Sequence, residues 1–314
     1  MYRGRKISVV VPAHNEEKKI KDVITGIPEF VDYVVITDDC SSDATAAVAL
    51  EAGDPRVTVI KHEQNTGVGG AIITSHSKAL EFESEFNVVM AGDDQMDPKY
   101  LQIILDPLID GTHGYVKGNR LSDKESFSSM PRYRVFGNFI LSFLNKFASG
   151  YWNITDAQNG YTGISAEVLN KIDFRSVSQG YEFENCMLSR LNEHDIPVLD
   201  VAIPALYADE VSGINLVTVI PALLKSFATS LVKRIFSKYI KRVKIIPILS
   251  MAIFVSSLLS FFFGVVTLNL RIALLSAIGL LLSSAILSFY DYLKTPSPWK
   301  VQQVEGSQSS QTMG

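Results

Sequence analysis

Two long apolar runs without charge, close to the C-terminus, constrain this chain more than any other feature. The first covers residues 245–268, and the second covers residues 272–290 after a link of three residues. As helices that rise about 1.5 Å per residue, both are long enough to cross a hydrocarbon core of about 30 Å. Because the link is so short, we expect a tight hairpin of two membrane spans, with the parts before and after it on one side of the bilayer.

The charges divide the chain at about residue 210. Residues 1–210 contain 19 Lys and Arg against 31 Asp and Glu, whereas residues 211–314 contain 10 against 2, and no carboxylate occurs from Val211 through Tyr290. The basic residues just before the first apolar run are Lys233, Arg234, Lys238, Lys241, Arg242 and Lys244. Only Arg271 lies in the link. The positive-inside tendency therefore predicts a multi-pass protein of the cell membrane whose N-terminal domain and both termini are cytoplasmic.

An apolar stripe with helical spacing precedes the hairpin. Its members are Leu216, Val219, Ile220, Leu223, Leu224, Phe227, Leu231 and Ile235. Together with the basic residues, most of which lie off this stripe, it predicts an amphipathic juxtamembrane helix in the headgroup plane within residues 211–244. An ordinary helix that packs on a core fits the same pattern. We expect residues 291–314, which end in a polar stretch, to form a disordered cytosolic tail.

Residues 1–210 alternate apolar runs of strand length with segments of helix length. The runs cover residues 7–11, 33–37, 57–60 and 87–91, with a helix expected between each pair. This order predicts an α/β fold with a Rossmann-like parallel sheet. Ligands of such sheets lie at the carboxyl ends of the strands, so the polar residues that follow the strands are the candidate site.

Carboxylates follow the first, second and fourth runs. Asp93 and Gln95 offer two oxygen side chains one residue apart, which suits Mg²⁺ or Mn²⁺ completed by phosphates and water. Asp43 and Asp97 have a simpler interpretation as helix caps. The glycine-rich residues 65–70, which precede a helix, are weak evidence for a diphosphate contact, because they lack the spacing of the known phosphate-binding fingerprints.

Four motifs together resemble the family 2 glycosyltransferases of the GT-A fold. They are VVPAHNEE at residues 10–17, DDCSSDAT at 38–45, NTGVGGA at 65–71 and DDQMDP at 93–98. The chain is most similar in plan to the dolichyl-phosphate mannose and glucose synthases, which place interface helices and membrane spans after such a domain. The resemblance covers about residues 5–210 and implies a GT-A mixed sheet. It also implies transfer of a sugar, with inversion, from a nucleoside-diphosphate sugar to polyprenyl (dolichyl) phosphate.

The same resemblance implies a role for each candidate residue. The nucleoside would be held by Pro12, His14, Asn15, Glu16 and Asp39, and the metal with the donor diphosphate by Asp93 and Gln95. Arg120 and Arg134 would contact the donor or lipid phosphate. Asp156 would orient the acceptor or accept a residual proton, and Glu184 would be structural. We expect His62, His76, His113 and His194, which have no partner spacing, at the surface.

One position departs from the family pattern. The first carboxylate of the family's Asp-x-Asp is Ala91 here, and Asp94 stands where a small residue is usual. The metal is then held by fewer protein ligands, Asp94 substitutes, or the enzyme depends less on metal. A non-catalytic membrane partner with a decayed site is a further alternative, as is transfer to a hydroxyl of a lipid or glycan, which would need a general base.

The expected partners follow from this function. They are the nucleotide sugar, the polyprenyl phosphate and the lipid bilayer, with no nucleic acid, and the spans leave a homo-oligomer possible. A phosphate monoester is largely ionised at neutral pH and needs no strong base to attack the anomeric carbon. Catalysis would then consist of positioning and charge neutralisation.

Overall fold

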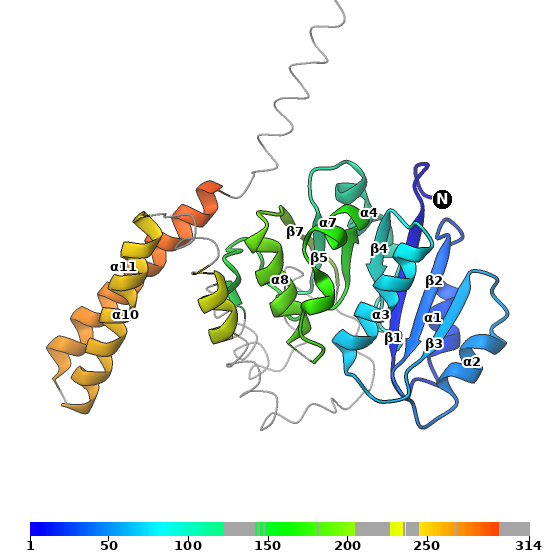
Figure 1. Ribbon diagram of the computed structural model, residues 1–314, viewed down its shortest axis with the longest axis horizontal. Coiled ribbons are helices and arrows are strands. Elements are labelled where there is room, and N and C mark those ends of the chain that lie inside the picture. Colours follow the sequence, from blue (N-terminus) through cyan, green and yellow to red (C-terminus); the bar gives the residue numbers. More distant parts are fainter. Residues whose placement is uncertain are drawn as a thin grey trace, which may run out of the picture.

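Seven strands form one mixed sheet with helices on both faces, and a hairpin of two long helices stands beside it (Figure 1). The computed structural model describes residues 1–121, 142, 145–146, 148–180, 182–204, 227–234, 236, 245–267 and 269–294. The elements up to the sheet's fifth strand are β1 (Ile7–Ala13), α1 (Ile20–Gly26), β2 (Tyr33–Asp38), α2 (Thr45–Glu51), β3 (Val57–Lys61), α3 (Val68–Glu81), β4 (Phe86–Val89), η1 (Pro98–Tyr100), α4 (Leu101–Ile109) and β5 (Tyr115–Asn119). The later elements are β6 (Thr162–Ser165), α7 (Ala166–Lys171), η2 (Phe174–Ser176), α8 (Phe183–Glu193), β7 (Val198–Ala202), α10 (Ile245–Val266) and α11 (Leu270–Lys294).

The strand order is β3-β2-β1-β4-β6-β5-β7. The first four strands along the chain are mutually parallel, as expected from the alternating apolar runs. β6 runs antiparallel to both β4 and β5, which makes the sheet mixed, and β7 pairs in parallel with β5. The carboxyl ends of β1, β2 and β4 therefore lie side by side at one edge.

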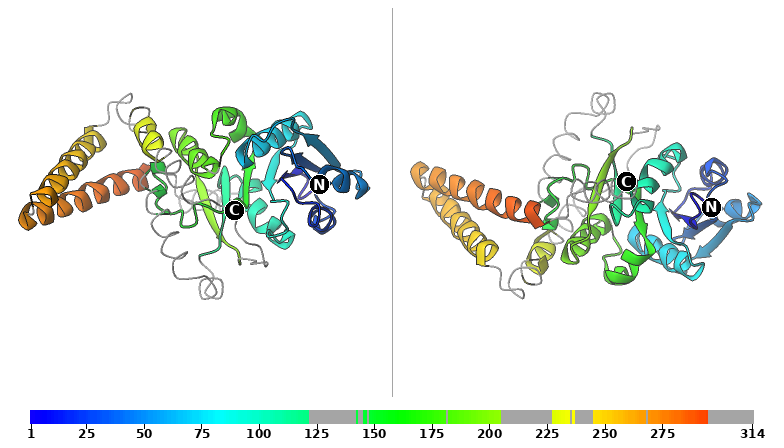
Figure 2. Two further views of the ribbon diagram at one scale, coloured as in Figure 1. Left: turned by 90° about the horizontal axis from the view of Figure 1, so that it is seen from below. Right: turned by 90° about the horizontal axis from the view of Figure 1, so that it is seen from above.

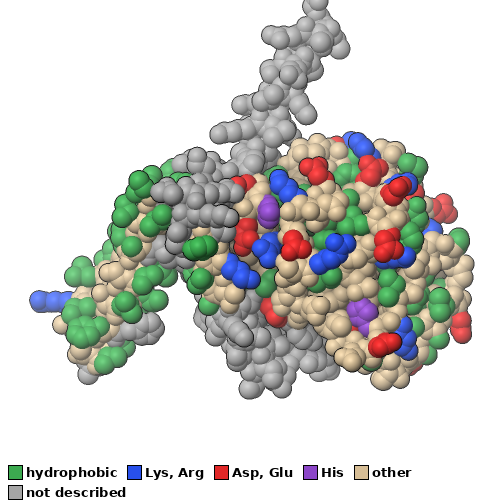
Figure 3. Space-filling view, in the orientation of Figure 1, with side chains coloured by type: hydrophobic (Ala, Val, Ile, Leu, Met, Phe, Trp, Pro, Cys, Tyr) green, Lys and Arg blue, Asp and Glu red, His purple; other side chains and the backbone are tan. Residues whose placement is uncertain are grey.

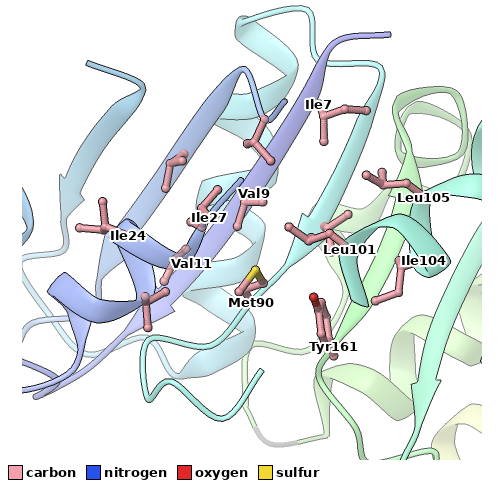
Figure 4. Packing of buried hydrophobic residues seen from close by; sticks show 14 of the residues in the cluster. Ile7, Val9, Val11, Ile24, Ile27, Met90, Leu101, Ile104, Leu105 and Tyr161 are labelled. Carbon is pink, nitrogen blue, oxygen red and sulfur yellow. The ribbon is translucent and has the colours of Figure 1, made fainter. Parts of the chain in front are cut away.

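Each face of the sheet carries its own apolar core. Successive side chains of a strand point to opposite faces, so Val9 and Val11 of β1 pack in one cluster with α1 and α4, whereas Val10 packs in the other with α3, α7 and α8. Figure 4 shows Val9 and Val11 of β1, with Met90 directly after β4, among Ile24 and Leu101 of these helices. The two views of Figure 2 place α3 and α4 on opposite sides of the sheet. This packing fixes the strand ends that carry the candidate site.

The hairpin matches the two expected apolar runs. Ile245–Val266 and Leu270–Asp291 are long and apolar enough to cross a membrane. The second helix begins at Leu270, two residues earlier than the uncharged run, because the Asn269 side chain accepts a hydrogen bond from the amide of Ile272 at the helix start (3.3 Å). The surface of the hairpin is mostly apolar, whereas acidic and basic side chains mix over the α/β domain (Figure 3). The hairpin turn lies at the end far from that domain (Figure 1).

Arg234 does not lie on an exposed polar face. Within the expected amphipathic helix the structure describes residues 227–234 and 236, and there Phe227 is buried and Leu231 half-buried, as the apolar stripe indicates. Arg234 is buried too and forms an ion pair with Asp291. A guanidinium can be buried when a carboxylate offsets its desolvation. The expected disordered tail of residues 291–314 was wrong at its start, because residues 291–294 continue α11 and Asp291 is buried in the ion pair. The rest of that segment lies outside the described residues.

Candidate active site

The loops that follow β1, β2 and β4 meet through their backbones. The amide of Asp39 donates to the carbonyl of Ala13 (2.8 Å), and the amide of Gly92 donates to the carbonyl of Pro12 (3.2 Å). One residue other than glycine in each loop has a left-handed backbone, with φ of 59° at Asn15, 60° at Cys40 and 61° at Asp94. Such conformations are costly, and they cluster at functional sites.

The residues expected at the nucleoside hold the first two loops together. A ring nitrogen of His14, Nδ1, lies 2.9 Å from the Asp39 carbonyl, and the side-chain oxygen of Asn15 accepts from the amide of Ser42 at 2.8 Å. The amide of Glu16 donates to the hydroxyl of Thr45 (2.8 Å). Pro12, His14, Asn15, Glu16 and Asp39 thus come together at one sheet edge, which is where a parallel sheet binds its ligand.

The carboxylate of Asp39 is buried and accepts hydrogen bonds from its own chain. The amides of Thr66 and Gly67 donate to it at 2.9 and 2.8 Å, and the Thr66 hydroxyl does so at 3.0 Å. His62 Nδ1 lies 2.7 Å from the same carboxylate. Burial alone would raise the pKa of Asp39, but these hydrogen bonds outweigh burial and lower it. Asp39 therefore fixes the turn at residues 65–67 as an anion.

The expectation of surface histidines was wrong for His76 and His113, and His62 is largely covered. The side chain of His62 is 14% exposed and also hydrogen-bonds Thr74 through Nε2 (2.9 Å). His113 and His76 are buried, and burial lowers the pKa of His76 to about 3, so that its ring is neutral. The acidic partner of His62 precedes it by 23 residues in the sequence, a separation to which no local pattern points.

The glycine-rich residues serve packing. A Cβ at Gly67 or Gly69 would lie 2.6 and 2.7 Å from the carbonyl oxygens of Gln179 and Ser178, and the amide of Gly70 donates to Gln179 (3.2 Å). The amide of Gly67 already donates a hydrogen bond to Asp39. Small residues here let the start of α3 approach the backbone at residues 178–180, so the glycines have a use that requires no diphosphate.

A pocket opens beside the loop after β4. Its lining includes Asp93, Gln95 and Arg120, three of the expected site residues, together with Asp97, Asn159 and Tyr161. The amide of Gln95 donates to Asp93 Oδ1 (3.1 Å), which orders the turn. Asp94 does not line this pocket and is exposed. Asp97 caps η1 by accepting from the amide of Lys99, as its simpler interpretation predicts.

Arg120 reaches this pocket while it is held by Asp156. Its Nε and Nη2 donate to the two oxygens of Asp156 at 2.7 and 3.1 Å, and its amide adds a third bond at 3.1 Å. The Arg120 side chain is 33% exposed and that of Asp156 3%. Although burial acts in the opposite direction, the bonds from Arg120 lower the pKa of Asp156. Arg134, the other expected phosphate contact, lies outside the described residues.

A buried polar network lies beside this pair, and two of its members, Lys117 and Asp200, belong to none of the sequence motifs. Lys117 of β5 is fully buried, donates to Glu184 at 2.9 Å and hydrogen-bonds the carbonyl of Asn159. The role expected for Glu184, a structural one, is consistent with this pairing. Asp200 of β7 accepts from Asn119 (2.9 Å) and from the amide of Thr155 (2.7 Å), the neighbours of Arg120 and Asp156. Burial raises the pKa of Asp200 to about 6.

The donor set for a cation at this site is small. In the parts of the chain that the structure describes, no group of three or more His, Cys, Asp or Glu side chains could hold a metal ion. Asp93 and Gln95 supply one carboxylate and one amide oxygen at the pocket wall. Such ligands suit a hard cation that takes its remaining ligands from water and substrate phosphates.

Comparison with known proteins decides the family. Residues 8–173 match the family described as Glycosyl transferase family 2. The chain belongs to glycosyltransferase family 2. It is 31% identical over 218 residues to a UDP-N-acetylglucosamine–dolichyl-phosphate N-acetylglucosaminyltransferase of Methanococcus voltae, covering 65% of this chain and 86% of that one. This glycosyltransferase is also 27% identical over 190 residues to an undecaprenyl-phosphate mannosyltransferase of Micrococcus luteus, covering 59% and 77%.

A solved structure shares the fold. Glucosyl-3-phosphoglycerate synthase of Mycobacterium tuberculosis, crystallised with Mn²⁺, UDP-glucose and phosphoglyceric acid, superposes with a TM-score of 0.53. Its sequence is 20% identical, and the match covers 74% of this glycosyltransferase and 80% of that chain. The expected GT-A fold with a mixed sheet is thereby confirmed.

Proposed function

We propose that this glycosyltransferase moves a sugar from a nucleoside-diphosphate sugar to the phosphate of a polyprenyl (dolichyl) lipid, with inversion at the anomeric carbon. The observation that carries the proposal is one pocket that combines Asp93, Gln95 and the partly exposed Arg120, in a chain with two apolar helices of membrane-spanning length. The relatives from Methanococcus voltae and Micrococcus luteus, whose names specify polyprenyl-phosphate acceptors, support it.

The chemistry demands little beyond positioning. An acceptor phosphate is largely dianionic at neutral pH, so its oxygen attacks without a strong base. Arg120, which lines the pocket and is one-third exposed, would lower the repulsion between an anionic acceptor and an anionic donor. Asp156, kept ionised by Arg120, orients that guanidinium and balances its charge, and we assign it no proton transfer.

A divalent cation, Mg²⁺ or Mn²⁺, fits the donor set at Asp93 and Gln95. When bound there, the ion would neutralise charge on the leaving diphosphate. In the loop after β1, His14, Asn15 and Glu16 would border the nucleoside, and Asp39 would shape the turn at residues 65–67. Ala91, which replaces a family carboxylate, leaves Asp93 as the principal acidic ligand of this arrangement.

Exchanging one carboxylate at a time tests the assignment. Asp93→Asn should abolish formation of lipid-linked sugar from labelled nucleotide sugars and polyprenyl phosphate. Asp94→Asn, a matched change that suits the left-handed backbone at this exposed position, should retain most activity. Full turnover by Asp93→Asn, or loss only with Asp94→Asn, would contradict the role given to Asp93.

The acceptor class is tested separately. A phosphate acceptor predicts that the enzyme uses polyprenyl phosphate and ignores polyprenol of the same length. Efficient transfer to polyprenol or to a saccharide would favour the alternative, in which a hydroxyl attacks and a general base is required. The paired, ionised state of Asp156 favours the phosphate.

A further inference from the structure

A buried ion pair joins the segment before the hairpin to the end of its second helix. Arg234 Nη1 lies 2.8 Å from Asp291 Oδ2, and the two side chains are 1% and 0% exposed. Breaking a buried pair leaves an uncompensated charge, whereas the pair itself adds little to stability compared with apolar residues of the same volume. The role of this ion pair is better explained by the way it holds the segment before the hairpin against the end of α11.

This pair rests directly on the backbone of the α/β domain at Gly150. A Cβ at Gly150 would lie 2.1 Å from Arg234 Nη1 and 3.1 Å from Asp291 Oδ2, so any other residue would force the charged groups to shift from this arrangement. Gly150 also has a left-handed backbone, with φ of +81°. The contact therefore involves three separate parts of the chain: residues 227–234, α11 and the segment that begins at Gly150.

An apolar cluster extends the same contact two residues further. Trp152 packs against the buried Leu287 of α11, and so do side chains from the segment before the hairpin and from both of its helices, namely Leu231, Ile248, Phe254 and Tyr290. The base of the hairpin thus touches the α/β domain through Gly150 and Trp152. Both residues belong to the stretch that leads to the site.

From this contact the chain runs along β7 to Asp156. The Asn153 side chain donates to the carbonyl of Val198 (2.9 Å), and the amide of Thr155 donates to Asp200 (2.7 Å). Asp156 follows and holds Arg120 at the pocket. Asp156, the carboxylate that orients the guanidinium, therefore lies six positions after Gly150, which contacts the ion pair.

We infer that Arg234, Asp291 and Gly150 form a positioning lock, which ties the hairpin to residues 150–156 and so sets the Arg120–Asp156 pair for the lipid phosphate. The inference rests on the proposed function and deepens it, because it names the residues by which the membrane part acts on the acceptor side of the pocket. The nucleoside-side residues His14, Asn15 and Asp39 have their own hydrogen bonds outside this path. Displacing the lock should therefore affect the acceptor and spare the donor.

Two glycine variants of the full-length enzyme in lipid nanodiscs test the lock. Gly150→Ala places a methyl group between the charged groups, whereas Gly111→Ala imposes similar left-handed strain, at φ of +70°, with no atom within 4 Å of the new Cβ. We expect Gly150→Ala to raise KM for polyprenyl phosphate about tenfold or more, and to keep KM for the nucleotide sugar within about twofold. Gly111→Ala should change neither constant. Equal constants for the two variants, or a fall in kcat alone, would overturn the inference.

A readout independent of activity separates this inference from the proposed function. Hydrogen exchange of the amides at residues 151–156 should accelerate in Gly150→Ala and not in Gly111→Ala. If the wild type transfers no sugar to polyprenyl phosphate, the proposed function fails, while unchanged exchange in Gly150→Ala is the result that overturns the lock. Should Gly150→Ala not fold, Asp291→Asn takes its place, with Asp110→Asn, which breaks only an exposed pair with Arg3, as its control.

Discussion

At the scale of single residues, the Arg120–Asp156 pair decides how the pocket presents positive charge. Two parallel bonds fix the plane of the guanidinium, a geometry that an ammonium group cannot reproduce. The carboxylate is covered, so the pair is exposed to the pocket only through Arg120. In the proposed reaction, phosphate recognition would depend on the orientation of Arg120 as much as on its charge.

Conservative variants of this pair test that dependence. Arg120→Lys keeps the charge and loses the bidentate contact, and we expect kcat/KM for polyprenyl phosphate to fall by about 10- to 100-fold, equivalent to about 1.4–2.8 kcal/mol. Asp156→Asn should cause a loss of the same order, because the amide keeps only one acceptor oxygen. Measured kcat/KM values decide the matter, with Lys78→Arg on the exposed face of α3 as a control. Wild-type kinetics in Arg120→Lys would contradict a role for the bidentate guanidinium contact.

Asp200 predicts a pH dependence of stability. Burial raises its pKa in the folded protein to about 6 from an ordinary value of 3.8, so the folded state binds the proton more tightly than the unfolded state. Its contribution is therefore fully present below about pH 4 and is lost as the pH rises through about 6, a change of about 3 kcal/mol. Asp200→Asn, which cannot ionise, should remove this dependence.

The measurement is the difference in unfolding free energy between wild type and Asp200→Asn from pH 4 to pH 7. The stability of the wild type should decline relative to the variant across this range. Because both proteins contain the carboxylates with lowered pKa, such as Asp39 and Asp156, the contributions of these groups cancel in the difference. A difference that is constant with pH would show that Asp200 does not titrate there.

At the scale of elements, α3 shows how a packing requirement overrides helix propensity. Alanine normally stabilises a helix relative to glycine by about 1 kcal/mol. At Gly69, however, a Cβ would lie within 2.7–2.9 Å of backbone atoms of Ser178 and Gln179, and backbone moves less easily than a side chain. We expect Gly69→Ala to destabilise the protein by about 1–3 kcal/mol, as over-packing does. Thermal unfolding measures it, with Ser77→Ala in the same helix as the neutral control.

The local sequence pattern was sufficient to predict the strands, but it could not predict which distant residues pack or pair with one another. Apolar runs and strand-end carboxylates predicted β1 to β4 and placed Asp93 and Gln95 correctly at one edge, because strand period and parallel topology depend on nearby residues. The packing role of Gly69 depends on backbone more than a hundred residues later, and the burial of Arg234 depends on Asp291, 57 residues away. In the sequence Lys117 is simply a polar residue within a strand, and only the fold places Glu184, 67 residues later, beside it.

At the scale of the whole molecule, the hairpin and the charges predict an orientation. The hairpin turn lies at the end far from the α/β domain, so a hairpin that crosses the bilayer puts the turn on the opposite side from the domain (Figure 1). Among the basic residues before α10, Arg234 is neutralised by Asp291. Five positive charges then remain on that side, from Lys233, Lys238, Lys241, Arg242 and Lys244, compared with the single charge of Arg271 in the turn. This excess still favours a cytoplasmic domain.

Cysteine labelling tests the orientation. The two native cysteines are first removed by Cys40→Asn and Cys186→Ala, where asparagine is chosen because it tolerates the left-handed backbone at position 40. A single cysteine then replaces either Leu270 at the turn, which is 72% exposed, or the exposed Lys21 on α1. A membrane-impermeant maleimide added to intact cells should label Leu270→Cys and not Lys21→Cys, and permeabilised cells should show both. Labelling of Lys21→Cys in intact cells would place the site outside, where cytosolic nucleotide sugars do not reach it, and would contradict the topology on which a cytoplasmic donor depends.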